Sequence, residues 1–209
     1  MKVTIVGAGN MGRGIATRVI AGGNQVEIVD RDPTDAQKLA GELGDRATAL
    51  DSAMPLSGDV VVFAVYYPGI KDAVRNYADQ LTGKVVVDIT NPVDTATWDS
   101  LATAPGSSSA EEVQEIVPAG TPVVKAFNTT FASTLVEGEV EGQPLDVFIA
   151  GDNEGAKQKV AQLVSDGGLR PIDVGPLRRA QQLEQTGFLH IAIQQPLGLG
   201  FISAIKLVH

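Results

Sequence analysis

The chain alternates short, continuously apolar runs with longer stretches in which apolar residues recur every three to four positions. A continuous run such as residues 60–65 (VVVFAV) is typical of a strand buried on both faces of a parallel sheet. The runs predict strands at Lys2–Val6, Gln25–Val29, Ala47–Leu50, Asp59–Val65, Lys84–Ile89, Pro122–Phe127, Asp146–Ala150 and Arg170–Val174. The periodic stretches predict helices at Met11–Ala21, Pro33–Leu43, Ile70–Gln80, Ala110–Val117, Asn153–Ser165 and Leu177–Ile193. This alternation predicts an α/β fold with a doubly wound, mostly parallel sheet of the Rossmann type.

Residues between these stretches mark where helices start. Ser109 and Glu112 have the spacing of a capping box, with Ser109 at the N-cap. Pro176 suits the first turn of the last helix. No repeat or linker divides the chain, so we predict a single domain over residues 1–209. Within it, residues 176–209 would form a helix and an apolar tail that packs on its own domain or on a second copy of the chain.

A glycine-rich loop joins the first predicted strand to the first predicted helix. It has the form G-x-G-x-x-G and comprises Gly7, Ala8, Gly9, Asn10, Met11 and Gly12. The first glycine of such a loop permits a tight turn, the second lets a pyrophosphate approach the backbone, and the third lets the helix pack on the strand. The helix N-terminus then offers its N–H groups to the phosphates. With Asp30 following 18 positions after Gly12, the pattern predicts a dinucleotide site.

Asp30 and Arg31, at the end of the second predicted strand, point to different dinucleotides. A carboxylate here accepts hydrogen bonds from the adenosine ribose hydroxyls and repels a 2′-phosphate, which favours NAD. A guanidinium pairs with a 2′-phosphate, which favours NADP. Because Asp32 and Asp35 follow, the local charge slightly favours NAD. The residues alone leave the choice between NAD and NADP open.

Composition excludes several classes of function. The chain has 16 Lys and Arg against 25 Asp and Glu, a formal net charge of −9. It lacks the basic cluster that a nucleic-acid backbone demands. It has no Cys, which excludes thiolate catalysis and cysteine-held metal centres. The longest apolar runs are about six residues, against about 20 for a membrane span. We expect a cytoplasmic protein that binds neither nucleic acid, nor membrane, nor metal.

Six short motifs, in order along nearly the whole chain, resemble the NADP-dependent deazaflavin oxidoreductase family. The reductase domain of the metalloreductases is related to this family. The motifs are residues 9–12 (GNMG), 64–68 (AVYYP), 88–92 (DITNP), 124–129 (VKAFNT), 150–152 (AGD) and 173–177 (DVGPL), the last followed by Arg179 and Ala180. Each motif is weak by itself, and their common order carries the resemblance.

The resemblance implies a role for individual positions. Those implied to lie along the nicotinamide half of the cofactor are Ala64, Val65 and Tyr66, and those implied to line the mouth where the acceptor ring stacks are Asn91, Asn128 and Thr129. Arg31 matches the residue that binds a 2′-phosphate in the family, whereas Asp30 stands where the family usually has Ser or Thr. The implied chemistry is hydride transfer between a nicotinamide and a flavin or deazaflavin.

Such a transfer needs two aligned rings more than it needs acid–base side chains. His190 lies in an apolar helix and is expected to be a core histidine, while Lys125 is expected to form an ion pair or cap a helix. We predict an NAD(P)H-dependent oxidoreductase with a flavin-like or deazaflavin-like small-molecule acceptor. We expect it to form a homodimer, with Asn128 and Thr129 positioning the acceptor.

Two alternatives stay open. The first is a non-catalytic dinucleotide sensor, because the family often has His at the position of Asn128 and the chain offers no evident acid–base group. The second is an enzyme like the pyrroline-5-carboxylate and imine reductases, which share the GAGNMG opening. Those enzymes carry a substantial helical domain, for which the roughly 35 residues after the last predicted strand are too few.

Overall fold

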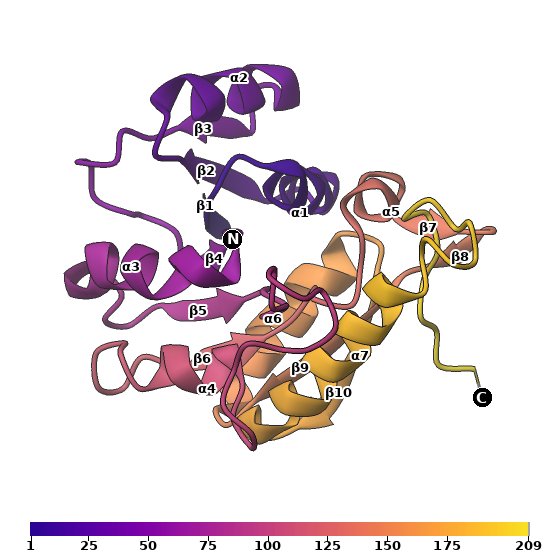
Figure 1. Cartoon of the computed structure of the whole chain (residues 1–209). Helices are drawn as coiled ribbons and strands as arrows, with labels where there is room; N and C mark the ends of the chain where they lie inside the picture. The colour runs from indigo at the N-terminus through magenta and orange to yellow at the C-terminus, as the bar shows by residue number, and fades with distance from the viewer. Residues whose placement is uncertain (209) are drawn as a thin grey trace.

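An eight-stranded sheet runs through the computed structural model, which describes residues 1–208 (Figure 1). Its order is β10-β9-β6-β5-β4-β1-β2-β3. The strands of this sheet are β1 (Lys2–Val6), β2 (Gln25–Val29), β3 (Ala47–Ala49), β4 (Val60–Phe63), β5 (Val85–Asp88), β6 (Val123–Lys125), β9 (Asp146–Gly151) and β10 (Arg170–Gly175). The α-helices are α1 (Asn10–Ala21), α2 (Pro33–Leu43), α3 (Tyr67–Tyr77), α4 (Ser109–Gln114), α5 (Ala132–Glu137), α6 (Glu154–Asp166) and α7 (Ala180–Ala192). The predicted α/β, doubly wound fold is therefore confirmed.

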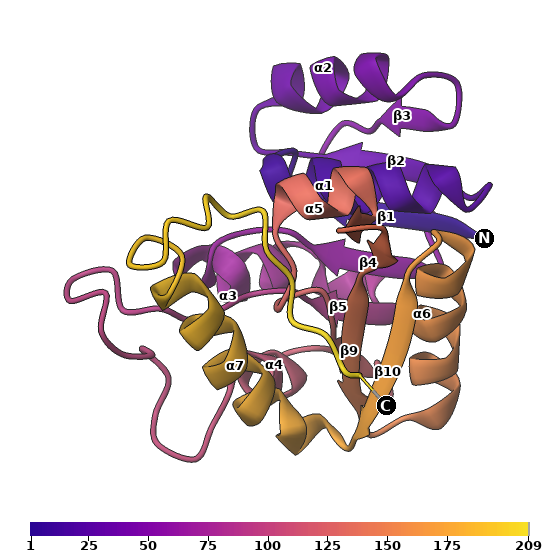
Figure 2. The same ribbon diagram turned by 90° about the vertical axis from the view of Figure 1, so that its right-hand side faces the viewer.

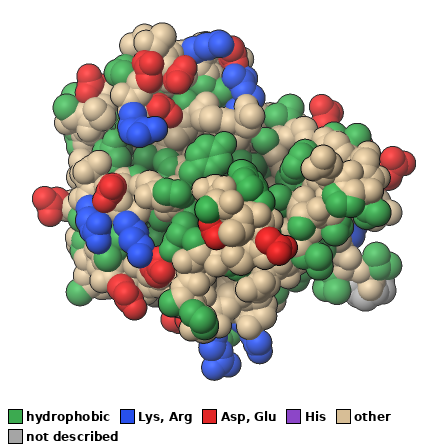
Figure 3. Space-filling model, viewed as in Figure 1, with side chains coloured by type: hydrophobic (Ala, Val, Ile, Leu, Met, Phe, Trp, Pro, Cys, Tyr) green, Lys and Arg blue, Asp and Glu red, His purple; other side chains and the backbone are tan. Residues whose placement is uncertain are grey.

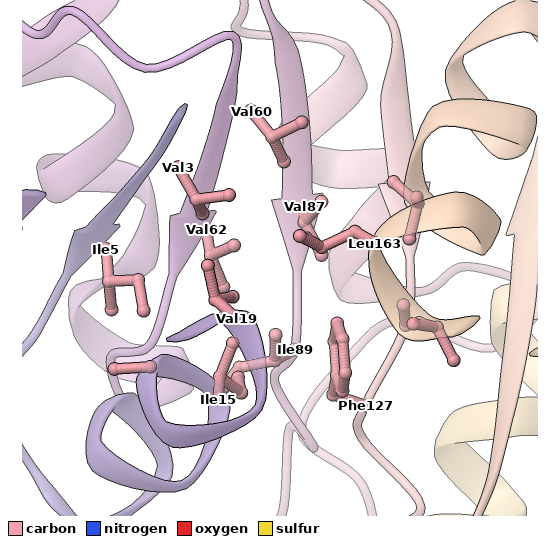
Figure 4. Packing of buried hydrophobic residues seen from close by; sticks show 14 of the residues in the cluster. Val3, Ile5, Ile15, Val19, Val60, Val62, Val87, Ile89, Phe127 and Leu163 are labelled. Atoms are coloured by element: carbon pink, nitrogen blue, oxygen red, sulfur yellow. The ribbon is translucent and has the colours of Figure 1, made fainter. Parts of the chain in front are cut away.

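The central strands are apolar on both faces because helices cover both. All four residues of β4 are fully buried. On one face the sheet packs against α1, α2 and α6, where Ile15 and Val19 of α1 belong to the same buried cluster as Val3, Val62 and Ile89 (Figure 4). On the other face it packs against α3 and α4. Burial on both sides explains why these strands read as continuous apolar runs rather than as alternating ones.

The strand order reverses between β1 and β4, which defines where ligands bind in this class of fold. The chain passes from β1 outward to β2 and β3, then returns to β4 on the other side of β1 and continues to β5 and β6, all parallel. Only β9 and β10 are reversed, since β9 pairs antiparallel with β6. In an open α/β sheet the crevice outside the carboxyl ends of the strands, at such a reversal, is the ligand site. β1 runs leftward from the N-terminus in Figure 2, so this carboxyl edge faces the viewer of Figures 1 and 3.

The structure corrects the predicted cap of α4. The N-cap is Ser108, not Ser109: the Ser108 hydroxyl accepts a hydrogen bond from the Glu111 N–H and donates one to the Glu111 carboxylate. Ser109 is instead fully buried, and its hydroxyl accepts a hydrogen bond from Thr90. Two consecutive serines, each followed three positions later by Glu, satisfy the same pattern. The local sequence therefore could not distinguish them.

The structure also contains elements that the sequence did not predict. They are α5 and a two-stranded antiparallel hairpin of β7 (Glu139–Val140) and β8 (Gln143–Pro144). The last predicted helix is divided into a 3₁₀ turn, η2 (Leu177–Arg179), and α7; another 3₁₀ turn, η1 (Ala78–Gln80), follows α3. Among residues 1–208, no helix is both long enough and apolar enough to cross a bilayer.

The segment after α7 packs on its own domain, which was one of the two predicted possibilities. The Phe201 ring meets the Phe131 ring edge-on at 5.1 Å between centroids. Near the end of the segment, Lys206 and the Leu207 N–H bind the buried carboxylate of Asp146. Several apolar side chains of α7 and the segment stay exposed, namely Leu189, Leu197, Phe201, Ile202, Leu207 and Val208.

Candidate functional site

The glycine loop between β1 and α1 has little room for side chains except at one position. Gly7 has φ +117°, and a Cβ there would overlap the Ala64 carbonyl oxygen at the end of β4. A Cβ on Gly12 would overlap the Gly7 carbonyl oxygen. A Cβ on Gly9 would meet nothing within 4 Å. The space over Gly9 is therefore open to a ligand, as a pyrophosphate-binding loop requires.

The N-terminus of α1 adjoins this open space. Its N-cap is Gly9, and no side chain caps it. The first turn contains Asn10, Met11 and Gly12 and has no acidic residue. The N-terminal N–H groups and the positive end of the helix dipole thus face the space over Gly9, which fits a dinucleotide pyrophosphate.

Asp30 is occupied by contacts within the protein. One carboxylate oxygen accepts a hydrogen bond from the Ala8 N–H at 2.7 Å, and the other accepts one from the Asp32 N–H at 3.1 Å. The carboxylate thus fixes the glycine loop to the start of α2. The adjacent Arg31 is exposed, and its side chain has no hydrogen bond or ion pair with any described residue. Its guanidinium is therefore available to an external anion.

The end of β4 forms the middle of the carboxyl edge. The Ala64 N–H donates to the Val6 carbonyl at 2.8 Å, which places Ala64 beside the glycine loop. Ala64 and Val65 are half-buried, and Tyr66, at the N-cap of α3, is 91% exposed. Apolar side chains gather in the middle of this face (Figure 3). These three residues could lie along a flat ligand that extends from the glycine loop toward β5.

Tyr67, next to Tyr66, faces a different environment. Its hydroxyl donates to the Glu112 carboxylate on α4 at 2.9 Å. Burial, together with Glu112, raises the pKa of Tyr67 to about 12. Tyr67 is therefore a neutral hydrogen-bond donor that joins α3 to α4.

Asn91 and Asn128, which follow β5 and β6, bind each other. The Asn91 Nδ2 donates to the Asn128 backbone carbonyl at 2.7 Å, and the Asn128 Nδ2 donates to the Asn91 Oδ1 at 2.9 Å. Asn128 Nδ2 also donates to the Leu183 carbonyl of α7 at 2.8 Å. Gly187 allows this approach, because a Cβ there would overlap Asn91 Oδ1. The structure thus brings together two predicted residues that are 37 positions apart.

The Asn128 side chain leaves one buried acceptor unpaired. Its Oδ1 is buried and has no hydrogen-bond partner among the described residues. Two acceptors, Asn91 Oδ1 and the Leu183 carbonyl, fix the Nδ2 on the opposite side. The backbone before Asn128 is also unusual, since the buried Phe127 has φ +62°. Strained backbone and unpaired buried polar groups are found preferentially at functional sites.

Thr129 is buried beside Asn128, and its carbonyl lies 3.2 Å from His190 Nδ1. The other ring nitrogen of His190 lies 2.9 Å from the Ser203 hydroxyl. Burial lowers the pKa of His190. His190 is a neutral core residue that joins α7 to Thr129, as expected.

A buried charged cluster at the same edge was not predicted as a unit. The Lys125 Nζ lies 3.0 Å from Asp88 Oδ2 and 2.7 Å from Glu184 Oε1, and all three side chains are fully buried. Burial raises the pKa of Glu184, an effect that Lys125 opposes. The ion pair of Lys125 was expected, but Glu184 was not singled out. Its signal was a stripe of polar and small residues at helical spacing, comprising Glu184, Gly187 and His190 of α7 and Gln194 just after it.

A hollow lies between α7 and the loop that precedes α4. It has a volume of ≈ 760 Å³ and is lined mainly by residues 99–107 together with Gln181, Gln182, Gln185, Thr186 and Phe188. This volume is within the range of small-molecule sites. Thr186 adjoins Gly187, which packs against Asn91, so the hollow and the asparagine pair share α7. Within residues 1–208, no three His, Asp or Glu side chains are placed to hold a metal ion.

Comparisons with known proteins identify the relatives of this chain. Residues 2–92 match the model of the family described as NADP oxidoreductase coenzyme F420-dependent. The F420-dependent NADP reductase of Methanothermobacter thermautotrophicus is 31% identical over 201 residues, covering 88% of this chain and 85% of that protein. A candidate F420-dependent NADP reductase from Arthrobacter sp. FB24 has a solved structure with TM-score 0.86 and 28% identity, covering 100% of both chains.

The metalloreductase STEAP3 of Rattus norvegicus is 32% identical over 183 residues. This match covers 88% of the present chain but 36% of the rat protein. The chain therefore spans about a third of the length of that relative.

Proposed function

Because this chain belongs to the family of coenzyme F420-dependent NADP oxidoreductases, we propose that it transfers a hydride between NADPH and a deazaflavin or flavin ring. The supporting observation is the continuous set of residues along the carboxyl edge. It begins at the open space over Gly9, passes Ala64 and Val65 at the end of β4, and ends at the Asn91–Asn128 pair. This is the path that an extended dinucleotide takes across the strand reversal of such a sheet.

The adenosine end supports NADPH over NADH. The Asp30 carboxylate is oriented toward the protein backbone, since each of its oxygens accepts one N–H, from Ala8 and from Asp32; in this proposal its main role is to shape the glycine loop. The exposed Arg31 guanidinium can pair with a 2′-phosphate through charge-assisted hydrogen bonds. The slight preference for NAD suggested by local charge is thereby reversed in this proposal.

The redox end needs to position two rings and exclude water. When bound, the reduced nicotinamide supplies a hydride from C4: the C4–H electron pair moves to the acceptor ring, the nicotinamide is oxidised, and a proton from solvent completes the reduced acceptor. The Asn91–Asn128 pair would form the protein wall beside the nicotinamide ring. Ala64 and Val65 would support the ring, and Thr129 would help to position the acceptor.

Nucleotide binding and turnover test this proposal separately. Purified protein is titrated with NADPH and with NADH by calorimetry. It is then assayed without oxygen for oxidation of each nucleotide by a 5-deazaflavin, FMN or FAD. The proposal expects tighter binding of NADPH and turnover with at least one acceptor. NADPH binding without turnover on any of them would contradict it and favour a dinucleotide sensor.

We further propose that the protein acts in the cytoplasm as a homodimer. Leu189, Leu197 and Ile202 are more than half exposed on α7 and the segment after it. Exposed apolar side chains that lie together often mark an interface between subunits. Sedimentation velocity at micromolar protein tests this, and a single monomeric species would contradict the dimer.

A further inference from the structure

The buried cluster of Asp88, Lys125 and Glu184 joins three elements at one point. Asp88 ends β5, Lys125 ends β6, and Glu184 lies on α7. The Lys125 ammonium donates to both carboxylates and to the Thr90 carbonyl. An ammonium has three donors, so each is satisfied.

This cluster fixes the backbone that carries Asn91. The Thr90 carbonyl accepts from Lys125, and the Thr90 N–H donates to the Asp88 carboxylate at 2.8 Å. Both backbone polar groups of Thr90, its N–H and its carbonyl, are therefore held by the cluster, one residue before Asn91. Without Lys125 and Asp88, both groups would be buried without partners.

Glu184 connects α7 to the same cluster. Its second carboxylate oxygen accepts from the Ser109 N–H at 3.1 Å, while the Ser109 hydroxyl accepts from Thr90. The preceding residue on α7, Leu183, accepts from Asn128. Glu184 thus ties α7 to β6 and α4 at the level of the Asn91–Asn128 pair.

Stability alone does not account for a cluster of this kind. Burying charges costs desolvation energy that their attraction offsets only in part, so apolar residues of similar volume often stabilise a fold equally well. A buried ionic cluster does, however, define one geometry, because each charge must keep its partners.

We propose that Lys125 and Glu184 are positioning residues for the proposed hydride transfer. Through Thr90 and α7 they hold the Asn91–Asn128 pair in place at the nicotinamide end of the cleft. Neither residue contacts the cofactor in this account. The inference rests on the proposed function for its effect on turnover, but its effect on the backbone at Thr90 can be measured without turnover.

The test compares Glu184→Ala and Glu184→Gln with a matched control. Glu27 on β2 is also a buried carboxylate, and it accepts hydrogen bonds from Thr4, Ser57 and Lys2. Lys2 and Thr4 lie on β1 and Ser57 precedes β4, whereas the asparagine pair follows the carboxyl ends of β5 and β6. Glu27→Ala therefore removes a comparable buried carboxylate without touching Thr90.

Three measurements are made on each variant: amide hydrogen exchange of residues 85–92, the Kd for NADPH, and kcat with the acceptor. In Glu184→Ala we expect faster exchange at Thr90 and Asn91 and a Kd within about twofold of wild type, since the glycine loop and Arg31 are intact. We expect kcat to fall at least about tenfold, since small misplacements of reacting groups cause losses of this size. Glu184→Gln keeps one acceptor and should recover part of kcat. Glu27→Ala should lower the stability of the protein but leave the amide exchange rates of residues 85–92 and kcat unchanged.

Unchanged exchange at residues 85–92, or unchanged kcat, in a folded Glu184 variant would overturn the inference. If Glu184→Ala does not fold, Glu184→Gln is judged by the same criteria. If the wild type binds NADPH but turns over no acceptor, the proposed function fails separately. The positioning role is then judged by the emission maximum of bound NADPH. Glu184→Ala should shift this maximum, and Glu27→Ala should not.

Discussion

The Asp30 carboxylate accepts a hydrogen bond from the Ala8 backbone N–H at 2.7 Å, so the acid that follows β2 holds the glycine loop that follows β1. In the sequence, Asp30 appeared to compete with Arg31 for the choice of dinucleotide. In the structure the two neighbours have separate tasks. Asp30 shapes the loop, and Arg31 remains exposed beside it.

This division predicts that Arg31→Ala weakens NADPH binding selectively. The lost charge-assisted contacts to the 2′-phosphate correspond to at least about a tenfold rise in the Kd for NADPH. The Kd for NADH should stay within about twofold. Calorimetric titrations with both nucleotides measure the difference. Lys159→Ala, an exposed cation on α6, is the control and should change neither value.

For Asp30→Ala we predict a different pattern. Because the carboxylate organises the loop, both nucleotides should bind more weakly by similar factors. A gain in NADPH affinity alone would instead mean that Asp30 acts by repelling the 2′-phosphate. The ratio of the two Kd values distinguishes these outcomes.

Gly9→Val should remove nucleotide binding without unfolding the protein. The space over Gly9 contains no protein atom within 4 Å of a Cβ, so a larger side chain fits the free protein but fills the place of the pyrophosphate. We expect the Kd for NADPH to rise by more than about tenfold and the unfolding midpoint to stay near that of wild type. Unchanged affinity would show that the glycine loop does not bind the dinucleotide.

Gly187→Ala should destabilise the contact between α7 and the asparagine pair. Its Cβ would overlap Asn91 Oδ1 and lie 2.9 Å from the Asn128 carbonyl oxygen. Overpacking of this kind costs about 1–3 kcal/mol of unfolding free energy.

Gly41→Ala in α2 is the matched control for Gly187→Ala, because its Cβ would meet nothing within 4 Å. It should stabilise the protein by about 0.5–1 kcal/mol. Urea unfolding of both variants provides the comparison, and equal effects would contradict the close packing at Gly187.

Asp146 predicts how stability depends on acid. Burial raises its pKa, but hydrogen bonds from Arg170, the Leu207 N–H and Lys206 outweigh burial and lower the pKa from 3.8 to about 2. A carboxyl with a lowered pKa in the folded state contributes stability above its unfolded pKa and loses it as the pH falls. We expect about 2 kcal/mol of unfolding free energy to be lost between about pH 4 and pH 2. Asp146→Asn should be less stable than wild type at neutral pH, and its free energy of unfolding should fall less on acidification. If the two proteins show the same dependence of unfolding free energy on pH, this assignment is contradicted.

The strands and the glycine loop could be predicted because their signals are local. β1, β4 and β5 are continuous apolar runs, and the loop is defined by glycine spacing and its flanking elements. The short α5 and the β7–β8 hairpin were missed, since each is too short to show a period. The cap at Ser108 was assigned to Ser109 because both serines satisfy the pattern.

The contacts that hold the Asn91–Asn128 pair could not be predicted from the sequence. Lys125 and Glu184 are 59 positions apart. No local sequence pattern at either residue indicates that the two side chains pair. The hydrogen bond from the Ala8 N–H to the Asp30 carboxylate likewise depends on the pairing of β1 with β2, which brings the two loops together. Sequence therefore identified Asn91 and Asn128 individually, through resemblance, while only the structure placed them in contact.

Direct transfer of deuterium tests the central claim most sharply. NADPH labelled with deuterium at both C4 positions is incubated with the protein and a 5-deazaflavin without oxygen, and the reduced acceptor is analysed by mass spectrometry. The ring carbon that receives the hydride in a deazaflavin does not exchange with water. The account predicts that one deuterium from NADPH appears in the reduced acceptor, and that Gly9→Val abolishes this transfer. Reduction of the acceptor without the label, or NADPH binding with no reduction at all, would contradict direct hydride transfer by this protein.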